Sequence, residues 1–386
     1  MPDTISALEI EDLDQGWLSL DRIVGPLDKK VENGKSALVE ALGIDMSGFL
    51  DTGYTYSFNR PGSRKQHNIS LRDFDKDHNQ IVFNDFNLTL EKPEKGWGVG
   101  FKLAADFGRM AELLRESTFW EPRLHREPSA ELREIFVTST IPLGNGLQVR
   151  GGLFESPLGL EAIPSPGDYN DNISRSFLFG FAAPHRHLGA LLTYPVYEML
   201  SVSAGLVTGW DMVRDINRQP SFLGGMTLKP NDEFSWESNL IVGPEQRDRG
   251  GPKRLAWSNV ITIEPTDPLT LSFEYTYGHE EKVTVNLRSG TWQGVAGIAS
   301  FDWTGRFNTA LRAEFFSDRD GVRNGILAKN VQLGELTLTG AYKFTAKLLG
   351  RVEVREDLAD RRIFQEGNTG TKKNQITLAW QVIYTF

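Results

Sequence analysis

The chain has 386 residues, no cysteine and a formal net charge of -9. The lack of thiols excludes disulfides, thiolate metal sites and thiol nucleophiles, and the negative charge argues against a nucleic-acid partner, because phosphate binding needs a concentrated basic surface. The 38 glycines, 23 phenylalanines, 9 tryptophans and 9 tyrosines describe an aromatic, turn-rich chain, which favours an all-β fold.

The first 43 residues do not share the pattern of the rest of the chain. Leu27 to Leu42 reads as a modest helix with Val31 and Leu38 partly on one side. Met1 to Leu18 lack the basic start and apolar centre of a secretion signal. We expect residues 1–43 to form a periplasmic segment with a short helix, for which a frayed leader and a docked or plugging helix are the two interpretations.

From Ile44 onward the chain breaks into segments of alternating polarity, each about ten residues long, which is the length of a tilted strand that crosses a bilayer. No run of 18 apolar residues occurs, which excludes a transmembrane helix. The last segment alternates most regularly. Its apolar face holds Ile376, Leu378, Trp380, Val382, Tyr384 and Phe386, and its other face holds Gln375, Thr377, Ala379, Gln381 and Thr385.

Short turns and long connections follow each other along the chain. The short turns are rich in Pro, Gly, Asn and Asp and lie at 93–96, 144–146, 195–199, 230–233, 265–268, 304–306 and 345–347. The long polar connections span 59–79, 109–129, 155–186, 211–220, 244–253, 279–290, 317–330 and 357–372. This asymmetry is typical of a transmembrane barrel and not of a soluble sandwich. It predicts an antiparallel, up-and-down barrel of about 16 strands over residues 44–386, with short turns toward the periplasm.

A series of motifs runs along nearly the whole chain from Ser47. It includes the opening Ser47-Gly48-Phe49-Leu50-Asp51-Thr52, the run Asn172-Ile173-Ser174-Arg175-Ser176-Phe177, the group Arg312, Glu314, Phe316, Asp318, Asp320, Gly321 and Arg323, and the closing Tyr384 and Phe386. In their order these motifs resemble the OmpL-like family of outer-membrane β-barrel porins. The resemblance implies a pore-forming barrel in the bacterial outer membrane, surrounded by lipid.

The longest connection, the third of the long loops, is the first candidate for a functional site. General porins are similar in that their third loop folds inward and narrows the channel. Its charged residues are therefore constriction candidates, and a loop lying over the rim is the alternative. These residues are Glu155, Glu161, Asp168, Asp171 and Arg175.

Charges on the strands form the second candidate group. A charge facing lipid costs roughly 2–4 kcal/mol at the bilayer midplane, so these side chains should point into a wet lumen. Arg312, Arg351 and Arg355 could form a basic wall opposite the third loop and sort solutes by charge. Cross-strand ion pairs that stiffen the wall are the alternative. The pore-lining candidates on strands are Arg150, Arg312, Glu314, Arg351, Glu353 and Arg355.

Signals for catalysis are poor. The sequence contains no nucleophile elbow, phosphate-binding glycine loop or metalloprotease helix, so we expect no enzyme activity, no metal site and no cofactor. We predict a porin through which small hydrophilic solutes diffuse passively, because a barrel of about 16 strands leaves an aqueous lumen. A structural barrel or scaffold of an envelope complex, with its lumen blocked, is the alternative. The solute and the presence of a homo-oligomer are left open.

Overall fold

The computed structural model describes residues 43–62, 68–94, 98–117, 130–284, 286–324 and 330–386. The expected helix at 27–42 lies outside the described residues, so the N-terminal periplasmic segment stays a prediction. Among the helices that are described, none is long and apolar enough to cross a bilayer.

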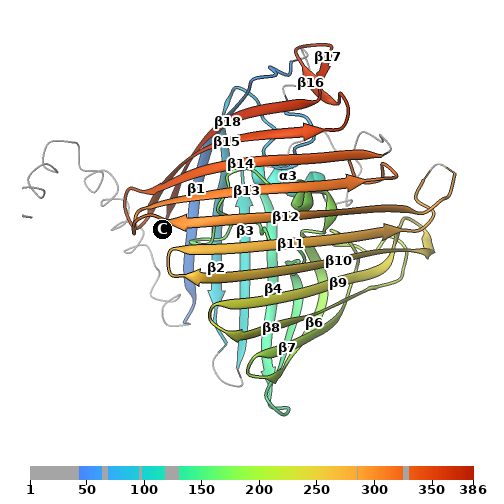
Figure 1. Ribbon diagram of the computed structural model, residues 1–386. Coiled ribbons are helices and arrows are strands. Elements are labelled where there is room, and N and C mark those ends of the chain that lie inside the picture. The colour runs from blue at the N-terminus through green and yellow to red at the C-terminus, as the bar shows by residue number, and fades with distance from the viewer. Residues whose placement is uncertain (1–42, 63–67, 95–97, 118–129, 285, 325–329) are drawn as a thin grey trace, which may run out of the picture.

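The described strands form one closed antiparallel barrel of 16 strands (Figure 1). Each strand pairs with its neighbour in the chain, and β18 closes the barrel by pairing with both β15 and β1. The strands are β1 (Asp45–Ser57), β2 (Ile81–Lys92), β3 (Val99–Phe107), β4 (Ala130–Ile141), β5 (Leu147–Glu155), β6 (Arg186–Tyr197), β7 (Leu200–Val207), β8 (Ser221–Asn231), β9 (Phe234–Gln246), β10 (Arg249–Thr266), β11 (Leu269–Glu280), β12 (Gly290–Asp302), β13 (Phe307–Asp318), β14 (Val331–Lys343), β15 (Leu348–Ala359) and β18 (Asn374–Thr385).

The alternating sequence of β18 explains why this segment is a wall strand. Gln375 and Thr377 are buried inside, whereas Ile376, Leu378 and Trp380 are exposed on the outer surface. Successive side chains of a strand point to opposite faces, so period-two polarity separates a lipid-facing side from a lumen side. The same separation recurs around the barrel and confirms the predicted fold.

Most connections lie where the turn and loop pattern predicts them, with one correction. The expected long loop at 244–253 is wrong, because β9 continues to Gln246 and β10 begins at Arg249. Only two residues separate the strands, and one of them, Asp248, has a φ of 57°, the left-handed conformation that tight hairpins need. The extension of β9 also buries Glu245, whose carboxylate accepts hydrogen bonds from the Trp210 amide and the Ser221 hydroxyl.

Three long loops contain structure that the polarity pattern does not predict. The second loop begins with helix α3 (Arg109–Ser117), and the third contains the short π-helix η3 (Leu178–Ala182). The last long loop forms a small hairpin from β16 (Phe364–Glu366) and β17 (Gly370–Lys372).

A bulge in β4 places two consecutive charges inside the barrel. The pairing of β3 with β4 shifts between Ala104 and Ala105, which leaves Arg133 as the extra residue on β4. Arg133 and Glu134 are both buried, while their neighbours Leu132 and Ile135 are exposed to the outside. An extra residue re-aims side chains locally, so the bulge adds an inward charge that strict alternation would not allow.

Candidate pore site

The third long loop, residues 156–185, lies inside the barrel. It leaves β5 and returns to β6, yet its contacts reach strands across the barrel, on β11, β14 and β18. The Leu160 amide donates to Glu274 on β11 at 3.0 Å, and the Tyr169 hydroxyl lies 2.7 Å from the Thr385 hydroxyl on β18. Between these points Asn172 donates to Thr339 on β14 at 2.8 Å. The loop therefore folds inward, as expected, and does not lie over the rim.

Carboxylates of the wall hold the loop by its backbone. Glu353 on β15 accepts hydrogen bonds from the amides of Ile173 and Ser174 at 2.6 and 3.1 Å. Glu314 on β13 accepts those of Phe177 and Leu178 at 2.7 and 2.5 Å. Charge-assisted bonds of this kind satisfy both the buried carboxylates and the amides of an irregular loop. These two candidate residues therefore position the loop.

The arginines of the basic wall contact the loop directly. Arg312 donates to Glu335 on β14 at 2.6 Å and to Glu161 of the loop at 2.7 Å. It also donates to the carbonyl oxygen of Ser174 at 2.7 Å. Arg312 is completely buried, so no open gap separates its guanidinium from the loop. These ion pairs correspond to the alternative given above, in which the arginines pair with carboxylates and stiffen the wall.

The other two wall arginines bind the same part of the loop. Arg355 donates to Asp357 at 2.7 Å and to the carbonyl oxygen of Arg175. Arg351 donates to Gln381 at 2.9 Å and to the carbonyl oxygen of Asn170. Both guanidiniums are therefore divided between a wall partner and a loop carbonyl, which fixes the height and orientation of the loop.

The remaining candidates lie apart from this network. Glu155 lies 3.4 Å from the Arg133 guanidinium at the end of β5. Asp168 and Asp171 are exposed on the loop, where they line a cavity of about 250 Å³ between the loop, β11 and β12. Arg175 is buried, with its guanidinium 5.6 Å from the centre of the Phe179 ring. Burial lowers the pKa of Arg175.

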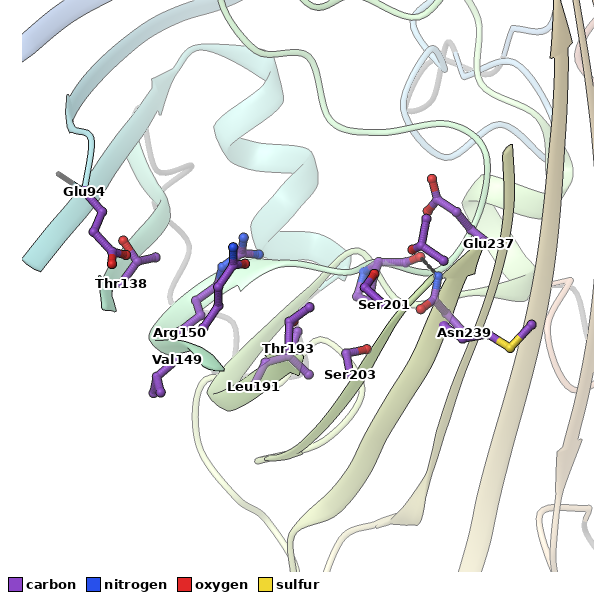
Figure 2. Close-up of a pocket in the computed structure, with 14 residues that line it drawn as sticks. Glu94, Thr138, Val149, Arg150, Leu191, Thr193, Ser201, Ser203, Glu237 and Asn239 are labelled. Atoms are coloured by element: carbon purple, nitrogen blue, oxygen red, sulfur yellow. Dashed lines mark hydrogen bonds between the residues drawn. The ribbon is translucent and has the colours of Figure 1, made fainter. Parts of the chain in front are cut away.

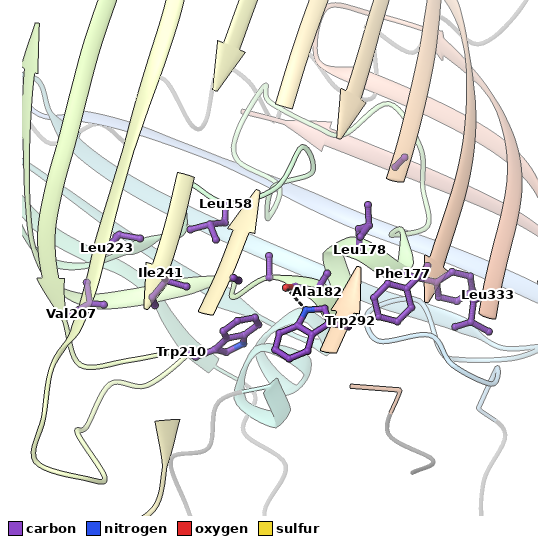
Figure 3. Close-up of a cluster of buried hydrophobic side chains, with 14 of the residues drawn as sticks. Leu158, Phe177, Leu178, Ala182, Val207, Trp210, Leu223, Ile241, Trp292 and Leu333 are labelled. Atoms are coloured by element: carbon purple, nitrogen blue, oxygen red, sulfur yellow. Dashed lines mark hydrogen bonds between the residues drawn. The ribbon is translucent and has the colours of Figure 1, made fainter. Parts of the chain in front are cut away.

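A cluster of buried apolar side chains joins the third loop to the wall (Figure 3). Trp292 on β12 is one of its two tryptophans, and the Trp292 indole nitrogen donates to the carbonyl oxygen of Ala182 at 3.1 Å. Gly278 on β11 is paired with Trp292, and a Cβ added to this glycine would lie only 1.9 Å from the indole. The members labelled in the figure are Leu158, Phe177, Leu178, Ala182, Val207, Trp210, Leu223, Ile241, Trp292 and Leu333.

An arginine between two tryptophans extends this cluster and was not a candidate from the sequence. Arg323, from the loop after β13, lies 4.7 Å from the Trp210 ring centre and 5.4 Å from that of Trp292. Its guanidinium donates to the carbonyl oxygen of Phe181 at 2.7 Å. The Arg323 guanidinium thus contacts Trp210 from the loop after β7 and Phe181 from the third loop, so residues of three loops meet there. The sequence signal was the position of Arg323 in the family motif, but alternation alone says nothing of loop residues.

Earlier loops also pack against the third loop. A second apolar cluster combines the first loop, α3 and the third loop, so three loops share one core inside the barrel. Its members are Phe74, Met110, Leu113, Leu114, Ile163 and Phe179.

A cavity of about 350 Å³ lies on the short-turn side of the third loop (Figure 2). Arg150 on β5 and Glu237 on β9 lie on opposite sides of it, and Pro157 of the third loop lines it as well. Serine and threonine side chains occupy the wall between the two charges. Of the eleven candidates, Arg150 is therefore the one that lines this cavity.

Comparison with known proteins agrees with this architecture. The family model described as "Putative beta-barrel porin-2, OmpL-like" matches residues 43–386. The chain belongs to this porin family. As a porin it resides in the bacterial outer membrane, and its family and fold indicate a channel rather than an enzyme. In the described part of the chain no group of three or more His, Asp or Glu side chains is placed to hold a metal ion.

Solved structures share the fold of this porin at low sequence identity. The outer-membrane channel DcaP of Acinetobacter baumannii is 14% identical, with a TM-score of 0.58 over 89% of this chain and 97% of that chain. An anion-selective porin from Comamonas acidovorans is 12% identical, with a TM-score of 0.59 over 89% and 99%. OmpF of Salmonella typhi is 13% identical, with a TM-score of 0.58 over 90% and 99%. No curated protein shows significant sequence similarity to the chain.

Proposed function

We propose that this porin lets small hydrophilic solutes diffuse passively through its lumen, past a constriction formed by the third long loop. The observation that carries the proposal is the anchoring of this loop across the barrel, from Glu274 on β11 to Thr385 on β18. A loop held at several points of a closed wall narrows the lumen by a defined amount. The proposal includes a homo-oligomer, since OmpT of Vibrio cholerae, a structural neighbour, is described in a trimer form.

The candidate residues divide into two roles in this proposal. Arg312, Arg351 and Arg355 set the position of the loop, because their guanidiniums are bound to its carbonyl oxygens or carboxylate. Arg150 and Asp168 line cavities and are exposed, so they face passing solutes. Charges on this path would change the local concentration of ions, which gives the channel its ion preference.

Conductance across a planar lipid bilayer tests this function. We expect the purified full-length chain to give stepwise ohmic currents in potassium chloride, because an aqueous path conducts in both directions. The same chain without residues 1–43 should conduct at least as well. The matched control is detergent buffer carried through the same reconstitution, which should give no steps.

A blocked structural barrel is the second candidate, and the packing of the loops favours it. The first apolar cluster joins the third loop to the wall and the second joins three loops to one another, which fills part of the lumen with side chains. A sealed barrel would insert into the bilayer without conducting. Proven insertion with no current in either chain would replace the channel proposal by the scaffold.

A further inference from the structure

We infer that the cavity on the short-turn side of the third loop, which we call the vestibule, binds short zwitterionic peptides. It would hold the peptide carboxylate at Arg150 and the peptide ammonium at Glu237 (Figure 2). This inference rests on the proposed channel function, because it names the solute class that the lumen would select.

Arg150 and Glu237 lack the ion-pair partner that several other lumen charges have. Elsewhere in the barrel Lys102 lies 2.6 Å from Glu134, and Arg254 lies 2.8 Å from Glu280. Within the described residues, neither Arg150 nor Glu237 forms an ion pair or a side-chain hydrogen bond. Their charged groups are therefore free to bind a solute.

The Arg150 guanidinium is held in place although its donors are free. It lies 4.9 Å from the ring centre of Phe136 and 5.8 Å from that of Phe154. Stacking on an aromatic face orients the guanidinium plane, and its N–H groups remain available for a carboxylate. Phe136 is opposite Gly152, whose φ is 137° and whose added Cβ would lie 2.2 Å from the Ile135 carbonyl oxygen. Glycine therefore lets β4 and β5 approach each other beside Arg150.

The wall between the two charges suits a peptide backbone. Strand register places Thr193 beside Ser203, and the next row places Ser201 beside Thr227 and Thr227 beside Glu237. Hydroxyl groups both donate and accept, so these rows can bind the amide groups of an extended peptide. The row on the loop side is apolar, since Leu191, which is paired with Arg150, lines the vestibule there.

The separation of the charges selects the length of the solute. Arg150 is on β5 and Glu237 on β9, four strand spacings of about 4.8 Å apart across the wall. The strand register places Ile241 in the row of Arg150, so Glu237 also lies four residues further along β9, toward its short turn. Together these offsets put roughly 23 Å of wall between the two backbones. Both side chains lie toward the space between them (Figure 2). A single amino acid carries both charges on one carbon and is too short. An extended tripeptide spans about 10 Å at roughly 3.4 Å per residue, which fits the gap left by two inward side chains.

Equilibrium dialysis of labelled triglycine against the detergent-purified full-length chain tests this inference. We expect saturable binding that weakens about tenfold when either peptide terminus is blocked, because each charge-assisted hydrogen bond is lost separately. N-acetyl-triglycine removes the ammonium, and triglycine amide removes the carboxylate. Equal binding of all three peptides would mean that the charges play no part and would overturn the inference.

Variants assign the charges to the two residues. Arg150→Gln should make binding insensitive to the peptide carboxylate, and Glu237→Gln should make it insensitive to the ammonium. The matched controls are Arg306→Gln and Glu233→Gln, which change exposed charges on short turns outside the vestibule and should bind triglycine as the natural chain does. Natural affinity in both vestibule variants would refute the assignment. Dialysis does not require conduction, so binding without current would reject the channel and keep the peptide site.

Discussion

At the scale of single residues, Arg312 shows how a charge is accommodated in the wall of this barrel. Its guanidinium is fully buried between Glu335 of the neighbouring strand and Glu161 of the third loop. Such a group contributes specificity of arrangement more than net stability, because desolvation offsets much of the attraction. Removing one partner alone lowers the free energy of unfolding, because the remaining charges stay buried without an opposite charge.

Replacing this arginine should therefore destabilise the protein. Arg312→Met leaves Glu161 and Glu335 without their cation and is expected to lower the free energy of unfolding by roughly 3–5 kcal/mol. Urea unfolding of the refolded chain in detergent, followed by tryptophan fluorescence, measures the change. Arg306→Met, on an exposed turn, is the control and should unfold as the natural chain does. A shift of the same size in both variants would contradict the role of the buried pairs.

His185 and Asp211 form a pH-dependent contact between two loops. Burial lowers the pKa of His185, but the Asp211 carboxylate, 3.6 Å away, outweighs burial and holds this pKa above its usual value; Asp73 acts in the same direction. The pKa of Asp211 is lowered, because His185 and backbone amides outweigh the effect of burial. The folded pair therefore favours the imidazolium and the carboxylate.

The stabilisation from this pair has a defined pH window. The part from His185 is complete below the unfolded pKa of about 6.5 and is lost as the pH rises through the raised pKa of the folded state. The part from Asp211 is lost only as the pH falls through its lowered pKa. NMR titration of His185 in micelles should show that Asp211→Asn lowers the pKa of the imidazole. Ser221→Ala is the control, and an imidazole pKa that is equal in all three chains would contradict the pairing.

At the scale of elements, the third long loop was predictable as a feature, but its attachments were not. Its similarity to the third loop of general porins implied an inward fold, and the alternation of Glu314 and Glu353 with apolar residues placed these carboxylates inside. Sequence alone assigns no partners across such distances: Glu161 and Arg312 are 151 positions apart. Their contact depends on barrel curvature and strand register, which polarity patterns do not encode.

Releasing the loop from its wall carboxylates should widen the channel. The double variant Glu314→Ala and Glu353→Ala leaves the amides of residues 173, 174, 177 and 178 without their acceptors. We expect a larger and noisier single-channel conductance, because the constriction can then move toward open lumen. The double variant Glu233→Ala and Glu264→Ala, which removes an exposed carboxylate from a short turn and another near the end of β10, should keep the natural conductance. An unchanged conductance in the first variant would show that the loop is held without these carboxylates.

At the scale of the whole molecule, the barrel follows from the sequence far more directly than its contents do. Strict alternation separates the two faces of β18, and seven short turns set the strand order, so the closed barrel of 16 strands could be predicted. The apolar filling could not, because Trp210, Arg323 and the residues of η3 lie in loops where no periodicity operates. The bulge at Arg133 is also invisible to a pattern of period two.

The contact between Tyr169 and Thr385 has a consequence for how the molecule is assembled. Tyr169 belongs to the connection between the fifth and sixth strands, whereas Thr385 is the penultimate residue of the chain. The third long loop cannot form this hydrogen bond until β18 has folded, and β18 closes the barrel by pairing with β1. An unfinished barrel would thus be leakier than the mature one, and its permeability would fall at the moment of closure.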